Sequence, residues 1–207
     1  MPKHAVLTGD IVNSTQLEPA TEKELVKELS KVLKPYQFEF YRGDSFQVYM
    51  KEPVKSFQAA LLCRSVAVSM TGDMNDISIS DVKISIGIGP VKTPVRTLAT
   101  AKGEAFILSG RSFDEMQGTG SRLSIKTGNM LADIGLQVIA DYADAIYKRM
   151  TAKQAEAICG LLKGGTQQSV ALQLDKSKST ISQLVSTGGW SEIERLLRQY
   201  ESLIKQL

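Results

Sequence analysis

The sequence predicts an α+β fold in which a strand-containing part is followed by an all-helical part. Short apolar runs and helix-like stretches share the first 127 residues, whereas apolar residues beyond that point recur at helical spacing. The hydrophobic content of 43% and charged content of 23% are those of a globular protein. The basic surplus is confined to residues 148–207, which have 9 basic and 5 acidic side chains. A basic helical segment fits a polyanionic partner.

Local signals in the first half predict a strand, a helix, a hairpin and a second helix. Their expected ranges are 4–8, 21–33, 36–42 with 45–51, and 53–69. The first range is compact and apolar, as in a buried central strand. Thr21 and Glu24 have the spacing of a helix capping box, which predicts where the first helix begins. The hairpin is expected to turn tightly at Gly43-Asp44.

Signals further along predict a polar loop followed by alternating strands and helices. The expected ranges are a loop at 71–76, strands at 82–88 and 122–126, and helices at 103–116 and 129–149. One apolar stripe defines the last helix: Leu131, Ile134, Val138, Tyr142 and Ile146. The first six elements follow the order β-α-β-β-α-β of the ferredoxin-like fold. In that topology the end of the first strand lies beside the hairpin.

Two aspartates each follow an apolar, strand-like run. Asp10 comes after residues 5–9, and Asp44 comes after residues 38–43. Because the predicted topology brings them together, the two carboxylates are expected to share divalent cations, Mg²⁺ or Mn²⁺, that bind nucleotide phosphates. The alternative is that Asp10 caps a turn and Asp44 suits a hairpin, with no ligand at either.

Other candidate ligands are few. His4 is the single histidine, which argues against a His-based metal site or a Ser-His-Asp triad. Cys63 and Cys159 lie among apolar, helix-like residues and are expected to be core thiols. No apolar run approaches the roughly 20 residues that span a bilayer. The N-terminal residues do not resemble a signal peptide, so the expected location is cytoplasmic.

Three motifs resemble those of class III nucleotidyl cyclase domains, in the same order. They are Gly9-Asp10-Ile11-Val12-Asn13-Ser14-Thr15, Gly43-Asp44 and Ile86-Gly87-Ile88-Gly89. The resemblance covers roughly residues 3–126 and implies a palm in which Asp10, Ile11 and Asp44 hold two metal ions. The turn formed by Val12, Asn13, Ser14 and Thr15 would then hold the triphosphate, because amides in a tight turn form an anion-binding concavity.

The same resemblance extends to a helix that stabilises charge at the transition state. The frame from Gly103 to Arg111 matches the family's, so Arg111 is the implied catalytic residue. Ile107 stands where the family has an asparagine, and Phe40 stands where it has a base-reading lysine. Compared with the family pattern, the residues implied to bind metal are therefore retained, whereas those implied to bind the base and orient the ribose are replaced. Family members pair head to tail, which implies a homodimer in which the metals of one chain meet Arg111 of the other.

Residues 151–207 are typical of a helix-turn-helix DNA-binding domain. Helices are expected at 151–163, 167–174, 178–186 and 192–207, with a cap at Thr166. The polar residues expected to contact DNA are Thr166, Gln167, Ser177, Lys178, Ser179, Thr180, Ser182 and Gln183. The alternative is a small helical bundle used for dimerisation.

The pattern of the whole chain resembles the bacterial SatD family, which combines a Gly-Asp-Ile segment, a Gly-Asp-x-Phe-Gln hairpin and a helix-turn-helix. The expected domains are a cyclase-like palm at 1–127, a connecting helix at 128–150 and a helix-turn-helix domain at 151–207. The first interpretation is a DNA-binding regulator whose palm binds a nucleotide with a divalent metal. The alternatives are a metal-dependent nucleotidyl cyclase or nucleotidyl transferase with an attached helix-turn-helix, and a structural adaptor. The altered Ile107 and Phe40 positions favour the first.

Overall fold

A five-stranded sheet forms the centre of the computed structural model, which describes residues 2–41, 43–70 and 80–207. The strands are β1 (Lys3–Val12), β2 (Gln37–Tyr41), β3 (Ser45–Met50), β4 (Asp81–Pro90) and β5 (Leu123–Lys126). Their order across the sheet is β2-β3-β1-β4-β5. β4 and β5 run parallel, and the other neighbours pair antiparallel. The ends of β1 and the β2–β3 hairpin therefore lie side by side.

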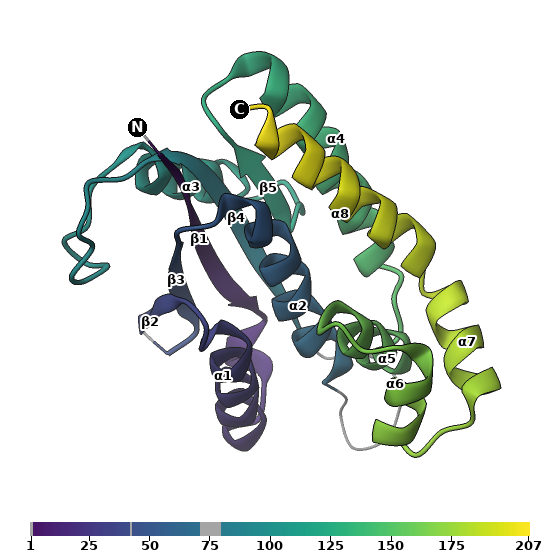
Figure 1. Ribbon diagram of the computed structural model, residues 1–207. Coiled ribbons are helices and arrows are strands. Elements are labelled where there is room, and N and C mark those ends of the chain that lie inside the picture. The colour runs from purple at the N-terminus through teal and green to yellow at the C-terminus, as the bar shows by residue number, and fades with distance from the viewer. Residues whose placement is uncertain (1, 42, 71–79) are drawn as a thin grey trace.

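Helices cover both faces of this sheet (Figure 1). They are η1 (Ser14–Gln16), α1 (Pro19–Leu33), η2 (Pro53–Lys55), α2 (Ser56–Ser69), α3 (Glu104–Glu115), α4 (Met130–Tyr147), α5 (Ala152–Leu162), α6 (Gln167–Gln173), α7 (Lys178–Thr187) and α8 (Trp190–Lys205). α1, α2 and α4 share the main core with Leu7 and Ile11 of β1. α3 packs on the opposite face, where Ala105 joins Val6. The mixed α+β expectation is confirmed.

The C-terminal helices pack against the sheet-bearing part. Apolar residues of α5 and α8 belong to the main core. The hydroxyl of Tyr200 donates to the carbonyl of Pro53 at 2.9 Å and lies 2.7 Å from the hydroxyl of Ser56. Gln58 donates to the carbonyl of Leu162 at 2.7 Å. The expected domain boundaries stay a prediction, and this core runs across them.

A smaller core holds α6 and α7 against α5. Its buried members are Ala157, Leu161, Val170, Ala171, Ile181 and Val185. Trp190 packs between this cluster and the main core, as expected. The side chain of Thr151 caps α5 and that of Thr166 caps α6, each within a capping box. The two cysteines are buried and unbonded, so the expectation of core thiols is confirmed.

Two local expectations are wrong. β1 continues to Val12, so Asp10 lies within a strand and not in a turn after it. α1 begins at Pro19, and no side chain caps its start, so the predicted capping box at Thr21 does not form. Proline suits the first helical position because its missing N–H would be unpaired there anyway. The loop expected at 71–76 lies outside the described residues.

The helix predicted at 129–149 forms as α4, and most of the apolar stripe that predicted it faces outward. Leu131 is 80% exposed, Ile134 61% and Val138 65%. The buried face is instead formed by Leu136, Ile139, Ala140, Ala143 and Tyr147. The helix therefore has two apolar faces, and the helical spacing of either one predicts a helix equally well.

Candidate functional site

The pairing of β1 with β3 brings Asp10 and Asp44 together. Asp10 lies opposite Ser45, the residue that follows Asp44. The hydroxyl of Ser45 donates to Asp10 Oδ1 at 2.6 Å, and that of Ser14 donates to Asp44 Oδ2 at 2.7 Å. The amide of Ile11 also donates to the carbonyl of Asp44 at 3.2 Å. One serine thus orients each carboxylate, and a backbone bond joins the two segments.

The structure explains why glycine precedes each of these aspartates. A Cβ added at Gly9 would lie 2.3 Å from the ring of Phe46, its partner across the strands. Gly43 has a φ of 95°, a conformation that L side chains rarely adopt. The absence of side chains therefore allows Phe46 to cross β1 and the hairpin to turn sharply. Both features fix where Asp10 and Asp44 lie.

The donor set at this pair suits a metal that is shared with a phosphate ligand. Within the described residues, no group of three or more His, Cys, Asp or Glu side chains could hold a metal alone. Mg²⁺ usually keeps several waters and binds through one or two carboxylates together with substrate phosphates. Two carboxylates, each held by a serine, fit that mode of binding better than a closed structural site.

Lys83 is a neighbour of Asp10 that sequence reasoning missed. The two residues lie directly opposite each other on β4 and β1, so their side chains share a face of the sheet. That face is the one covered by α3, because Thr8, two residues earlier, donates to Ser109 of α3 at 3.1 Å. The ammonium of Lys83 lies 5.7 Å from the ring centroid of Phe113. The sequence could not predict that Lys83 lies opposite Asp10, because the register of β1 and β4 decides which residues face each other.

The predicted phosphate-binding residues form a tight turn at the end of β1. Asn13 adopts the left-handed conformation, with φ 59° and ψ 27°, and leads into η1. Asn13 and Thr15 are exposed, whereas Val12 and Ser14 are half-buried. Ser14 is engaged with Asp44, so the turn and the carboxylate pair are mechanically linked.

Arg111, the predicted catalytic residue, lies on the exposed side of α3. The helix turns Ala105, Ser109 and Ser112 toward the sheet instead. Among the described residues, no hydrogen bond or ion pair joins Arg111 to Asp10 or Asp44. Ile107, one turn earlier, is 53% exposed. In this structure the predicted catalytic arginine is therefore not bonded to either predicted metal ligand.

A buried ion-pair network beside the sheet was also missed. Arg64 of α2 is fully buried and contacts Asp81 at 2.7 Å and Asp144 at 2.9 Å. Arg122 also binds Asp81, and Lys148 binds Asp144, at 2.7 and 2.8 Å. Burial alone would raise the pKa of Asp81, but Arg64 and Arg122 outweigh it and hold that pKa below its usual value. The sequence signal was a lone arginine within an otherwise apolar helix.

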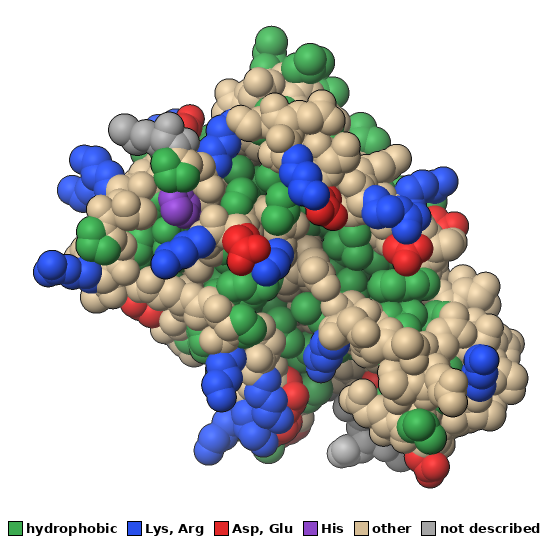
Figure 2. Space-filling view, in the orientation of Figure 1, with side chains coloured by type: hydrophobic (Ala, Val, Ile, Leu, Met, Phe, Trp, Pro, Cys, Tyr) green, Lys and Arg blue, Asp and Glu red, His purple; other side chains and the backbone are tan. Residues whose placement is uncertain are grey.

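The predicted DNA-contacting residues lie mostly in solvent. Thr166 and Ser177 serve as the N-caps of α6 and α7, and Gln167 is half-buried. The exposed members on α7 are Lys178, Ser179, Thr180, Ser182 and Gln183. Figure 2 shows the lobe over α6 and α7 mainly in tan, with few blue side chains, whereas blue side chains gather over α1. The α7 surface is therefore rich in hydroxyl and amide groups and is weakly basic.

No family model matches the chain, and no curated protein matches it. Two structures of a bacterial light-regulated adenylyl cyclase are similar. One has 12% identity over 59% of this chain and 74% of that chain, with a TM-score of 0.43. The other has 14% identity over 61% and 43%, with a TM-score of 0.43. The active GGEEF domain of a diguanylate cyclase from Vibrio cholerae has 13% identity over 61% and 85%, with a TM-score of 0.42.

Across residues 2–41, 43–70 and 80–207, no helix combines the length and apolarity needed to cross a membrane.

Proposed function

We propose that the palm binds a nucleoside triphosphate through Mg²⁺ or Mn²⁺ held by Asp10, Asp44 and the carbonyl of Ile11, and that it catalyses nucleotidyl transfer or cyclisation. One observation carries this proposal: Asp10 and Asp44, distant in sequence, are each oriented by a serine at the junction of β1 and β3. The resemblance of the three sequence motifs to class III cyclase domains supports it. A ferredoxin-like palm agrees with the strand order β2-β3-β1-β4.

Each residue of the site has a proposed role. A bound divalent cation would neutralise phosphate charge and polarise the reacting phosphoryl group. Asp10 and Asp44 hold their positions through Ser45 and Ser14, so little reorganisation is needed when the site fills. Exposed amide and hydroxyl groups of the turn at Asn13 and Thr15 would bind the triphosphate. Phe40 and Ile107 replace the family's base-reading lysine and its asparagine, so a purine specificity does not follow.

Calorimetry with ATP, GTP, CTP and UTP in Mg²⁺ or Mn²⁺ tests this proposal, with product analysis of the same mixtures. Asp44→Asn is expected to weaken metal-dependent nucleotide binding at least about tenfold, because it removes one charged ligand. Asp114→Asn, on the exposed end of α3, is the matched control and is expected to bind normally. Equal affinities of the native protein and Asp44→Asn would contradict the proposal. Binding without any product would leave a nucleotide-sensing palm in place of an enzyme.

We further propose that the active form is a homodimer, because Arg111 forms no hydrogen bond or ion pair with Asp10 or Asp44 of its own chain and the class III domains that the motifs resemble pair head to tail. The outward stripe of α4 supports a second copy as its occupant. With Met130 and Tyr142 added at 82% and 43% exposure, the stripe has five large apolar residues. They present on the order of 500 Å² per copy, against roughly 800 Å² per partner in a standard interface. Rim residues would supply the difference in area.

Sedimentation at micromolar concentration, with and without nucleotide and metal, tests the dimer. Ile134→Glu is expected to shift the protein toward monomer, because a carboxylate would then be buried in an apolar contact. Leu172→Glu is the matched control, since Leu172 is an isolated apolar residue that is 79% exposed on α6. A native protein that stays monomeric under all of these conditions would contradict the proposal.

DNA binding is a second candidate function for residues 151–207. Two observations favour it: the polar N-terminal face of α7 is exposed, and its cap at Ser177 leaves Lys178 and Ser179 projecting from the first turn. A helix-turn-helix interpretation, with α6 and α7 as its two helices, fits the expectation from the sequence and from the SatD resemblance. Failure to bind duplex DNA even at low salt would contradict this function and leave the helices as packing elements.

A further inference from the structure

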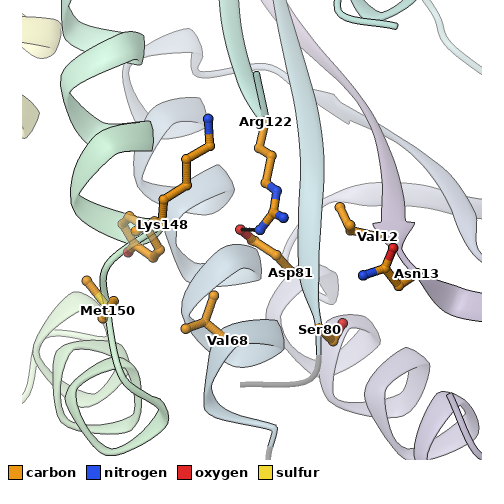
Figure 3. Close-up of a pocket in the computed structure, with 9 residues that line it drawn as sticks. Val12, Asn13, Val68, Ser80, Asp81, Arg122, Lys148 and Met150 are labelled. Carbon is orange, nitrogen blue, oxygen red and sulfur yellow. Dashed lines mark hydrogen bonds and ion pairs between the residues drawn. The ribbon is translucent and has the colours of Figure 1, made fainter. Parts of the chain in front are cut away.

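A polar pocket lies where β1 and α4 end and β4 and β5 begin (Figure 3). Its walls include Asn13, Asp81, Arg122, Tyr147 and Lys148, from segments far apart in the chain. The cavity volume is about 160 Å³. Pockets that enclose a whole drug-sized ligand measure roughly 300–1,000 Å³. The space therefore suits one small polar group with its waters.

The charges around this pocket do not balance. Arg64 is fully buried and bonded to both carboxylates, so it is occupied by Asp81 and Asp144 and does not reach the pocket. Arg122 and Lys148 then share the one remaining negative charge. Three cations face two carboxylates within this cluster, which leaves one net positive charge beside the pocket. Cations in a recessed, partly dry site attract anions more strongly than cations in open solvent.

Each carboxylate oxygen of this cluster already faces a cation, although Asp144 Oδ1, 2.9 Å from Arg64, accepts no hydrogen bond. Asp81 Oδ1 accepts from Arg64 and from the amide of Val82, and its Oδ2 accepts from Arg64 and Arg122. Asp144 Oδ2 accepts from the amide of Arg122 and pairs with Lys148. The guanidinium of Arg122 has five N–H donors and the ammonium of Lys148 has three, so both keep donors beyond these bonds. Their side chains are 33% and 42% exposed; in Figure 3 Arg122 reaches Asp81, whereas the ammonium of Lys148 points away from Asp81.

We propose that this pocket binds a phosphate group, held by Arg122 and Lys148 with the amide side chain of Asn13 at its rim. A planar guanidinium and a flexible ammonium together are a common pair for a tetrahedral oxyanion. The group is either inorganic phosphate or the terminal phosphate of a nucleotide. Its binding groups are cations, whereas the proposed metal site is built from the carboxylates of Asp10 and Asp44; Asn13, in the turn after β1, borders both.

Calorimetric titration of the full chain in EDTA tests the proposal, with inorganic phosphate in one arm and a nucleoside monophosphate in the other at constant ionic strength. Saturable binding is expected in at least one arm. Arg122→Gln and Lys148→Gln are each expected to weaken it by about ten- to a hundredfold, the effect of losing one charge-assisted contact. Lys205→Gln is the matched control, because Lys205 also pairs with a carboxylate four residues earlier on a helix.

Folding effects are separated from binding by a second variant. Arg122→Lys keeps the positive charge beside Asp81 but loses the forked guanidinium. Relative to Arg122→Gln, it is therefore expected to restore folding but only part of the phosphate affinity. Equal phosphate binding by the native protein and Lys148→Gln would overturn the proposal, as would no saturable binding in either arm. Asp44→Asn is expected to bind phosphate normally in EDTA, so failure of the metal site and failure of this pocket are distinguishable.

Discussion

Replacing Arg64 with methionine removes the centre of the buried ion-pair network. The guanidinium donates to Asp81 at 3.0 and 2.7 Å, contacts Asp144 at 2.9 Å and lies 4.9 Å from the ring centroid of Tyr147. Methionine fills much of the same volume with apolar atoms. What changes is that two carboxylates, 2% and 6% exposed, lose their shared cation.

The expected loss of unfolding free energy depends on the cations that the two carboxylates still contact after Arg64 is replaced. Breaking a buried pair by removing one partner costs about 3–5 kcal/mol, because a buried charge is left uncompensated. Asp81 keeps Arg122 and Asp144 keeps Lys148, so the lower end of that range is expected. A loss of about 3 kcal/mol corresponds to a fall in Tm of roughly 6–12 °C for a chain of this size.

Urea unfolding at neutral pH, followed by circular dichroism, measures this loss. Lys205→Met is the control, because it removes an exposed pair with Glu201 and is expected to change the free energy of unfolding by less than about 1 kcal/mol. Adding Asp81→Asn to Arg64→Met should recover part of the lost stability, because one uncompensated charge disappears. A loss below about 1 kcal/mol for Arg64→Met would refute the reasoning.

Three further predictions follow from named contacts. The loss of unfolding free energy caused by Arg64→Met should become smaller as the pH falls well below the usual Asp pKa of about 3.9. The reason is that the lowered pKa of Asp81 stabilises the folded state above that pH, and this stabilisation disappears when Asp81 is protonated. Urea unfolding at several pH values measures the change. Gly87→Ala should destabilise the protein by about 1–3 kcal/mol, because the added Cβ would lie 2.2 Å from the carbonyl oxygen of Ala105. Gly110→Ala should be tolerated, because no atom lies within 4 Å of a Cβ added there. Thermal unfolding compares the two variants. If residues 151–207 bind DNA, Lys178→Ala should flatten the slope of log affinity against log salt by about 0.9, and Lys31→Ala should not.

Elements with short-range signals were predictable from the sequence. The strict alternation from Val82 to Ile88 lies within β4, and the hydroxyl caps at Thr151 and Thr166 begin α5 and α6 as expected. These signals involve residues that are close along the chain, so each can be read locally. The neighbouring positions of Asp10 and Asp44 were also predictable, because element order fixes which strand ends meet.

Features that depend on long-range pairing were not predictable. Gly9-Asp10 has the composition of a turn, yet it lies in β1 because Phe46 from the hairpin crosses the space that Gly9 leaves open. The cluster around Arg64 joins segments near residues 81, 122 and 144, and no local pattern indicates that they meet. The sequence showed only that an arginine interrupts an apolar helix.

The two faces of α4 show why spacing alone does not tell which face of a helix is buried. Both faces repeat at helical spacing, but their side chains differ in size. The inner face includes Ala140 and Ala143, which are fully buried and allow the helix to approach the sheet closely. The larger Leu131, Ile134 and Val138 point outward, where a single chain gives them nothing to pack against. While five such residues stay in water, the protein lacks the stabilisation of roughly 25 cal/mol that burial gives for each Å² of apolar surface. A helix with two apolar faces can pack against two neighbours, and the proposed second copy of the chain would supply the second one together with its own Arg111.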